Sequence, residues 1–137
     1  MKVCVQTADF DAGAEMRILS RDPKVGAVAS FVGVVREVAL TLEHYPGMTE
    51  RALHKIVEEA RSRWQVLDST LIHRTGPLQP TDQIVLVAVA SSHRADAFAA
   101  CEFIMDYLKT QAPFWKKEGA GWVEARATVV QAAERWK

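Results

Sequence analysis

Apolar and polar residues follow two different periods along the chain, and these periods predict a mixture of strands and helices. Segments that alternate every second residue, or that are continuously apolar and rich in β-branched residues, predict strands. Strands are expected over Lys2–Gln6, Gly26–Val35, Ala39–Tyr45, Ser69–His73, Gln83–Ala90, Trp115–Lys117 and Trp122–Arg126. The strand over Gln83–Ala90 is the most apolar and is expected in the interior of the sheet. Gly33, inside the second segment, predicts a bulge.

Three other segments carry apolar residues at helical spacing. Helices are expected over 11–19, 49–64 and 93–111. Because strands and helices do not alternate as regular βαβ units, the pattern predicts an α+β domain with helices packed on a mostly antiparallel sheet. We expect residues 1–137 to form this single domain.

The helix ends carry recognisable signals. Asp9 or Asp11 is expected to cap the first helix, Thr49 the second, and Ser91 or Ser92 the third. Pro113 is expected to end the third helix, and a turn is expected at Gly76-Pro77. The predicted buried stripe of the third helix is Ala97, Phe98, Cys101, Ile104, Met105 and Leu108.

Composition narrows the class of protein. The 137 residues are 49% hydrophobic and 25% charged, and 17 basic residues balance 17 acidic ones. A net charge of zero argues against nucleic-acid or membrane-surface binding driven by total charge. Cys4 and Cys101 form no CxxC pattern, so neither a metal site nor a disulfide framework is expected. Free thiols and the lack of a signal-like start favour the cytoplasm.

The first candidate site is Ser91-Ser92-His93-Arg94, at the junction of a strand and a helix. A helix N-terminus offers free amide hydrogens and partial positive charge, and Arg94 and a protonatable His93 would add to it, so an anion such as phosphate could bind. The alternative is an ordinary capped helix with two exposed polar residues.

The second candidate is Lys109–Lys117, with sequence KTQAPFWKK. Three lysines lie within nine residues, interrupted by proline and mixed with aromatic residues. Mutual repulsion and partial burial lower the pKa of a lysine and make it a usable base or nucleophile. The alternative is a solvated basic turn with its aromatic residues in the core. Arg36 and Arg126, each at a predicted strand end, are weaker candidates, and Arg36 matters only if it points into the same pocket as the lysines.

The predicted third helix keeps the two candidates apart. Arg94 and Lys109 are separated by fifteen residues, or roughly 22 Å at about 1.5 Å per residue. They cannot contact the same small ligand within one chain. We therefore expect either two sites or a two-fold dimer in which Lys109 of one chain faces His93 and Arg94 of the other.

Four segments together resemble one family, the large subunit of molybdopterin synthase. They are TLEHYPGMTE (Thr41–Glu50), SSHRADAF (Ser91–Phe98), FIMDYLKTQAPFWKKE (Phe103–Glu118) and WVEAR (Trp122–Arg126). Their order and spacing match, and the resemblance covers nearly the whole chain.

The resemblance implies an α+β fold of the α/β hammerhead type and a central homodimer, with a small ubiquitin-like subunit at each end of a heterotetramer. It implies a sulfurtransferase of molybdenum cofactor biosynthesis, which converts cyclic pyranopterin monophosphate to molybdopterin. The small subunit's C-terminal Gly-Gly thiocarboxylate donates the sulfur, and no metal or organic cofactor is needed.

The resemblance also assigns residues by position. Lys109 and Lys116 match the family's catalytic lysines, and both also belong to its substrate site. Arg36 matches a substrate contact, and Lys117 and Glu118 continue the substrate-contacting stretch after Lys116. His93 and Arg94 match substrate contacts that reach across the dimer.

One feature departs from the family pattern. Only Glu37 to Leu40 separate Arg36 from the TLEHYPG strand, where family members usually have several more residues, and the segment between Lys117 and Trp122 is also short. This shortening puts the covering of the pocket near Arg36 in doubt. It leaves open a non-catalytic module that binds a phosphorylated ligand or a partner's tail. A nucleic-acid-binding domain would need a broad basic face, which the charge balance disfavours.

Overall fold

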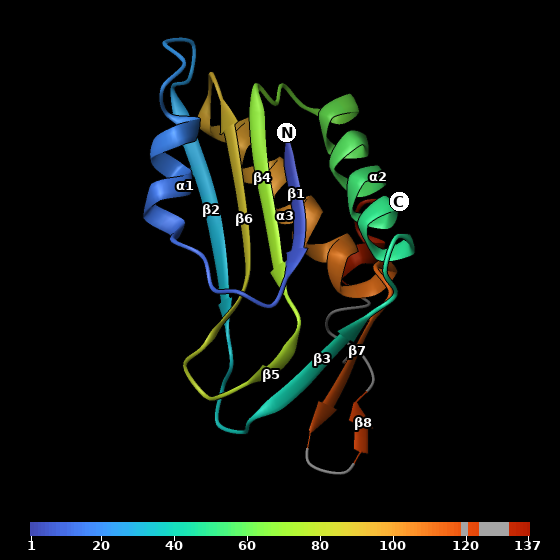
Figure 1. Ribbon diagram of the computed structural model, residues 1–137. Helices are drawn as coiled ribbons and strands as arrows, with labels where there is room; N and C mark the ends of the chain where they lie inside the picture. Colours follow the sequence, from blue (N-terminus) through green and yellow to red (C-terminus); the bar gives the residue numbers. More distant parts are fainter. Residues whose placement is uncertain (119–120, 124–131) are drawn as a thin grey trace.

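A computed structural model describes residues 1–118, 121–123 and 132–137, and within them the chain forms two four-stranded sheets, the helices α1, α2 and α3, and a further helical turn at 132–134 (Figure 1). The first sheet has the order β1-β4-β6-β2 and the second β5-β3-β7-β8. The strands are β1 Lys2–Gln6, β2 Ala27–Val34, β3 Leu40–His44, β4 Asp68–Arg74, β5 Gly76–Leu78, β6 Gln83–Ser91, β7 Phe114–Glu118 and β8 Gly121–Val123. The helices are α1 Ala12–Leu19, α2 Met48–Arg63 and α3 Arg94–Gln111.

Strand β6 lies inside the first sheet, as its continuous apolar sequence predicts. It pairs antiparallel with β2 and β4, whereas β1 pairs parallel with β4. Val85, Val87 and Val89 pack into the cluster that α2 and α3 form on one face of this sheet. The intervening Leu86 and Ala88 pack with residues of α1 on the other face. Alternating side chains of this buried strand thus pack into two hydrophobic layers, one on each face of the sheet.

The second sheet lies beyond the end of the first, near the end of β4 and the last turns of α3 (Figure 1). Strand β3 pairs antiparallel with both β5 and β7, and β7 pairs with β8. The α+β class with mostly antiparallel pairing is therefore confirmed. Within the described ranges, no helix has the length and apolar character needed to cross a membrane.

Most predicted strands agree with the structure to within one or two residues at each end. The bulge expected at Gly33 is confirmed, because the register between β2 and β6 shifts between Gly33 and Val34. Asp11 caps α1, and its carboxylate accepts a hydrogen bond from the Ala14 amide at 3.0 Å. Residues 124–126 of the last predicted strand, Arg126 included, lie outside the described residues.

Both predicted serine and threonine caps are wrong. Helix α2 begins at Met48, after Gly47 at a φ of 84°. The Glu50 carboxylate accepts the Gly47 amide at 2.9 Å, so Thr49 already lies in the first turn. Helix α3 has His93 as its N-cap, with no side-chain cap bond.

Two further expectations are corrected. Gly76-Pro77 begins strand β5 rather than forming a turn, because its backbone pairs with β3. Phe98 is 65% exposed although it was expected in the buried stripe of α3. Because it is one residue after Ala97, it lies about 100° further around the helix and beyond the edge of the buried face. The other five residues of the predicted stripe are buried.

Gly26 provides a test of the close approach between the start of β2 and the segment that follows β6. A Cβ at this position would lie 2.2 Å from the Ser92 carbonyl oxygen, whereas a Cβ at Gly13, in α1, would meet nothing closer than 3.4 Å. We expect Gly26→Ala to lower the free energy of unfolding by about 1–3 kcal/mol, because backbone must move. Gly13→Ala should instead raise it by about 0.5–1 kcal/mol through helix propensity. Urea denaturation of both variants checks this, and equal effects would contradict it.

Candidate active site

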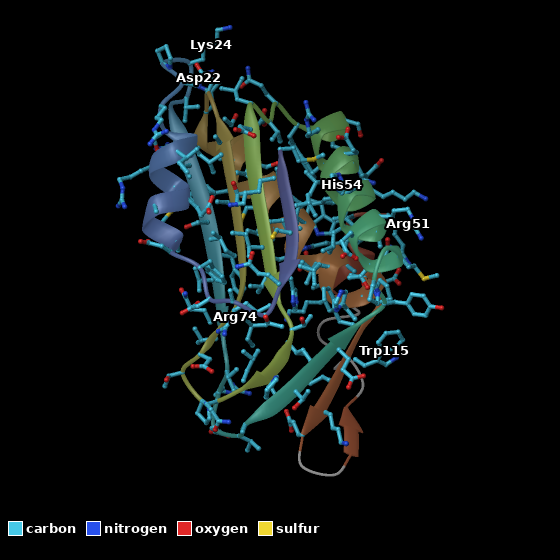
Figure 2. All side chains as sticks on the ribbon, viewed as in Figure 1. Asp22, Lys24, Arg51, His54, Arg74 and Trp115 are labelled. Carbon is cyan, nitrogen blue, oxygen red and sulfur yellow. The ribbon has the colours of Figure 1, made fainter. Side chains whose placement is uncertain are left out.

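Strand β7 has two faces of different character. Phe114, Lys116 and Glu118 alternate with Trp115 and Lys117, and the first three are partly buried while the other two are exposed. Successive side chains of a strand point to opposite faces, so Lys116 and Glu118 share a face that Lys117 does not. The exposed side of β7 is visible at Trp115, which points away from the second sheet (Figure 2).

Strand β3 shows that the face carrying Lys116 is the inner one. Leu42 lies directly opposite Lys116 in the sheet and Leu40 opposite Glu118, and both leucines are buried. The Lys116 ammonium nitrogen lies 3.0 Å from a Glu118 carboxylate oxygen. Both side chains are more than a third exposed. Such a pair contributes at most about 1 kcal/mol, so an incoming anion can replace Glu118 at little cost.

Lys109 lies in the last turn of α3, within electrostatic range of Lys116. Desolvation by surrounding protein lowers the pKa of Lys109, and the positive charge of Lys116 lowers it further. The side chain as a whole is exposed, so water still screens part of both effects. Lys109 is therefore a better base at neutral pH than an ordinary lysine.

His73, at the end of β4, also belongs to this group, although the sequence analysis did not single it out. Its side chain is buried, and its ring stacks on Phe114 with centroids 3.8 Å apart and planes at 18°. Burial lowers the pKa of His73 to about 4, and the charges of Lys109 and His44 act in the same direction. His73 is therefore neutral at physiological pH, and Nδ1 donates to the Arg74 carbonyl oxygen at 2.8 Å. The sequence feature that could have identified His73 is a single histidine within an otherwise apolar predicted strand.

Arg36 lies in a short, tight connection between β2 and β3. Its carbonyl oxygen accepts the Val38 amide at 2.8 Å, and Glu37 between them has a φ of 68°. A non-glycine residue in this region marks a constrained backbone. Arg36 is exposed and precedes Leu40, which pairs with Glu118, by four residues, so its Cα lies within roughly 14 Å of the Leu40 Cα.

His93 and Arg94 lie at the other end of α3 from Lys109. Both are exposed, at the edge where β6 ends. The neighbouring serine hydroxyls are used within the chain, because Ser91 donates to the Gln65 side-chain oxygen at 3.3 Å and Ser92 to the Lys24 carbonyl oxygen at 3.1 Å. A single chain thus brings together Lys109, Lys116 and Glu118 and leaves His93 and Arg94 apart.

A metal centre elsewhere in the described part of the chain would require charged or sulfur-bearing side chains to lie together. Among the residues that the structure describes, no three or more His, Cys, Asp or Glu side chains are grouped to hold a metal ion. Cys4 is partly buried and Cys101 is buried, and both are free thiols. Burial raises the pKa of the Cys101 thiol to about 11, so it is not a nucleophile at neutral pH.

Comparison with known proteins gives the same family from sequence and from structure. The family model of the MoaE protein matches residues 5–111. A molybdopterin synthase catalytic subunit of Ralstonia nicotianae is 59% identical over 144 residues, covering 96% of this chain and 82% of the relative. That span exceeds the 137 residues of this chain, so the relative has residues between the matched segments that this chain lacks.

Comparison with solved structures gives the same family as the sequence comparison. The molybdopterin biosynthesis MoaE protein from Burkholderia ambifaria has a TM-score of 0.89 and 58% identity, covering 99% of this chain and 98% of that one. A complex of subunits 1 and 2 of molybdopterin-converting factor from Helicobacter pylori shares the fold, with a TM-score of 0.73 at 19% identity over 90% of this chain and 89% of that one. The full-length match and the conserved architecture together establish that the chain belongs to the MoaE family of molybdopterin synthase catalytic subunits.

Proposed function

We propose that this protein is a sulfurtransferase that converts cyclic pyranopterin monophosphate to molybdopterin in molybdenum cofactor biosynthesis. The sulfur comes from the C-terminal thiocarboxylate of a small ubiquitin-like subunit. Membership of the MoaE family supports the activity. The observation that carries it is the proximity of Lys109 and Lys116, each a cation that can act on an anionic substrate, with the pKa of Lys109 lowered.

The two lysines have different environments, which suits different roles. Lys109, with its lowered pKa, accepts or delivers a proton, or activates the attack of sulfur on the pterin side chain. Lys116 stabilises the negative charge that develops on the thiocarboxylate carbonyl or on the opened phosphate. Glu118 holds Lys116 on the inner face of the second sheet until substrate arrives.

The remaining cations bind the substrate's phosphate. Arg36 approaches from the β2–β3 connection of the same chain. His93 and Arg94 come from a second copy of the chain, since α3 separates them from their own Lys109 by roughly 22 Å. Lys117, on the outer face of β7, belongs to the same substrate-contacting stretch but approaches from the other side of the strand. The pocket is therefore composite, and the active unit is a homodimer that binds two small subunits.

We place the protein in the cytoplasm, and its two thiols support this location. Cys4 and Cys101 are both free, as expected for the reducing cytoplasm. The thiocarboxylate donor, a reactive acyl sulfur compound, is also suited to that environment.

Replacing Lys109 by Ala should lower product formation about 100-fold or more, because a positioned acid–base group is lost. The assay mixes the variant with thiocarboxylated small subunit and the cyclic pterin and measures the dithiolene product. The matched control is Lys55→Ala, on the exposed side of α2, which should retain wild-type turnover. Light scattering should show the same dimer for both. Near-normal turnover by Lys109→Ala would reject the assignment, and absence of product with the unmodified protein would favour a binding module.

Mixing two inactive variants tests the composite pocket. Lys109→Ala and Arg94→Ala each damage both pockets of a homodimer. In a mixed dimer, one pocket carries both defects and the other carries neither. After dissociation and reassociation in equal amounts, about one quarter of wild-type activity should return, since half the dimers are mixed. No recovery in a sample shown to contain mixed dimers would place both residues in one chain's site.

The pH dependence of Lys109 tests its coupling to Lys116. Removing a neighbouring positive charge favours protonation, so Lys116→Gln should raise the pKa of Lys109. It should stay below that of an ordinary lysine, because desolvation is the larger cause and remains. The midpoint is measured by pulsed acetylation at a series of pH values, with the Lys109 peptide quantified by mass spectrometry. An unchanged midpoint would show that the two ammonium groups do not interact.

A further inference from the structure

The segment between α3 and β7 determines how Lys109 and Lys116 lie relative to each other. Helix α3 ends at Gln111 and β7 begins at Phe114, so only Ala112 and Pro113 lie between them. Ala112 is extended, and its carbonyl oxygen accepts the Phe114 amide at 2.9 Å. A small change in this turn would rotate β7 and its lysine against the end of the helix.

Thr49 holds this turn from α2. Its side chain has no exposed surface, and its hydroxyl donates to the Pro113 carbonyl oxygen at 3.0 Å. The Thr49 hydroxyl oxygen also accepts a hydrogen bond from the Tyr45 amide at 2.9 Å, just after β3. One hydroxyl thus joins the end of β3, the first turn of α2 and the turn before β7. This explains why Thr49 lies inside the helix and not at its N-cap.

His73 holds the same turn from the first sheet. Its ring covers Phe114 at 3.8 Å between centroids, nearly parallel. Because His73 is the penultimate residue of β4 and Phe114 starts β7, this stack joins the two sheets beside the lysines. His44 lies opposite Phe114 in the sheet, and its imidazole is 3.9 Å from the Glu50 carboxylate. The titratable groups near this turn are His44, which lies opposite Phe114, Glu50 beside His44, and Lys109, whose charge acts on His73. Lys116 and Glu118 lie further along β7.

We infer that Thr49 and His73 are positioning residues, which fix the Pro113-Phe114 turn and thereby the separation of Lys109 and Lys116. This inference rests on the proposed function for the importance of the two lysines, but the geometry itself can be tested without substrate. Neither side chain needs to touch the pterin. Misplacing a reacting group by about 1 Å can cost roughly 100-fold in rate, so residues of this kind act on turnover more than on binding.

The test compares Thr49→Val with Thr49→Ser. Valine keeps the branched shape but removes the hydroxyl, which leaves the Pro113 carbonyl and the Tyr45 amide without their shared partner, whereas serine keeps the hydroxyl. The first readout is the acetylation midpoint of Lys109 in the free protein, with Lys55 in the same sample as internal reference. The second is kcat and KM for the cyclic pterin with thiocarboxylated small subunit. Circular dichroism and thermal unfolding establish that each variant folds.

We expect Thr49→Val to move the Lys109 midpoint to higher pH, because Lys116 and the surrounding protein retreat from the amine. We also expect kcat to fall by about 10- to 100-fold with KM changed less than about twofold. Thr49→Ser should keep both values close to those of the unmodified protein. A folded Thr49→Val protein with an unchanged midpoint and unchanged kcat would overturn the inference for Thr49, and its role would then be stability alone.

Two variants of His73 provide an independent test of positioning, and this test is sufficient by itself if Thr49→Val does not fold. His73→Phe keeps a planar ring on Phe114, and His73→Leu removes it. We expect the Leu variant to shift the Lys109 midpoint and lower kcat, and the Phe variant to preserve both. Equal behaviour of the two variants would overturn the role of the stack. If the unmodified protein shows no sulfur transfer but the variants shift the Lys109 midpoint, positioning is supported and the proposed function is rejected. If the unmodified protein transfers sulfur and no variant shifts the midpoint, the proposed function is supported and positioning is rejected.

Discussion

The burial of one side of α3 against the first sheet constrains everything else in this molecule. Phe103, Ile104 and Leu108 are fully or almost fully buried, and they lie in the same cluster as the valines of β6. A helix of 18 residues held along its length cannot bend to bring its ends together. Its C-terminal end therefore meets the second sheet and its N-terminal end lies far from it, so the cations at the two ends cannot share a ligand within one chain.

A second constraint is electrostatic and local. Lys109, Lys116, His44 and His73 gather at one place, and such a cluster would repel itself if every group were protonated. Burial keeps His73 neutral above a pKa of about 4, and Glu118 partly compensates Lys116. Lys109 and Lys116 remain as two positive charges that act on each other. Desolvation and the charge of Lys116 lower the pKa of Lys109, and the lowered pKa makes the amine useful for proton transfer.

The connection between β2 and β3 is short. The chain turns there through Glu37, whose φ is positive, and the Arg36 carbonyl oxygen accepts the Val38 amide. Arg36 is consequently placed by a short turn with a constrained backbone. The two lysines do not depend on this connection, because their positions follow from α3, β7 and the Pro113-Phe114 turn.

The sequence alone determined what depends on neighbours along the chain. Periodicity located every described strand except β5, helices α1 to α3, β6 in the sheet interior, the bulge at Gly33 and the Asp11 cap, because each reflects a local pattern of burial or hydrogen bonding. Crowding of lysines in KTQAPFWKK also predicted the direction of the Lys109 pKa. Only the tertiary structure placed Thr49 against Pro113, stacked His73 on Phe114 and left Phe98 exposed. These contacts join residues tens of positions apart, and no local spacing specifies them because they arise from how the two sheets and α2 and α3 pack.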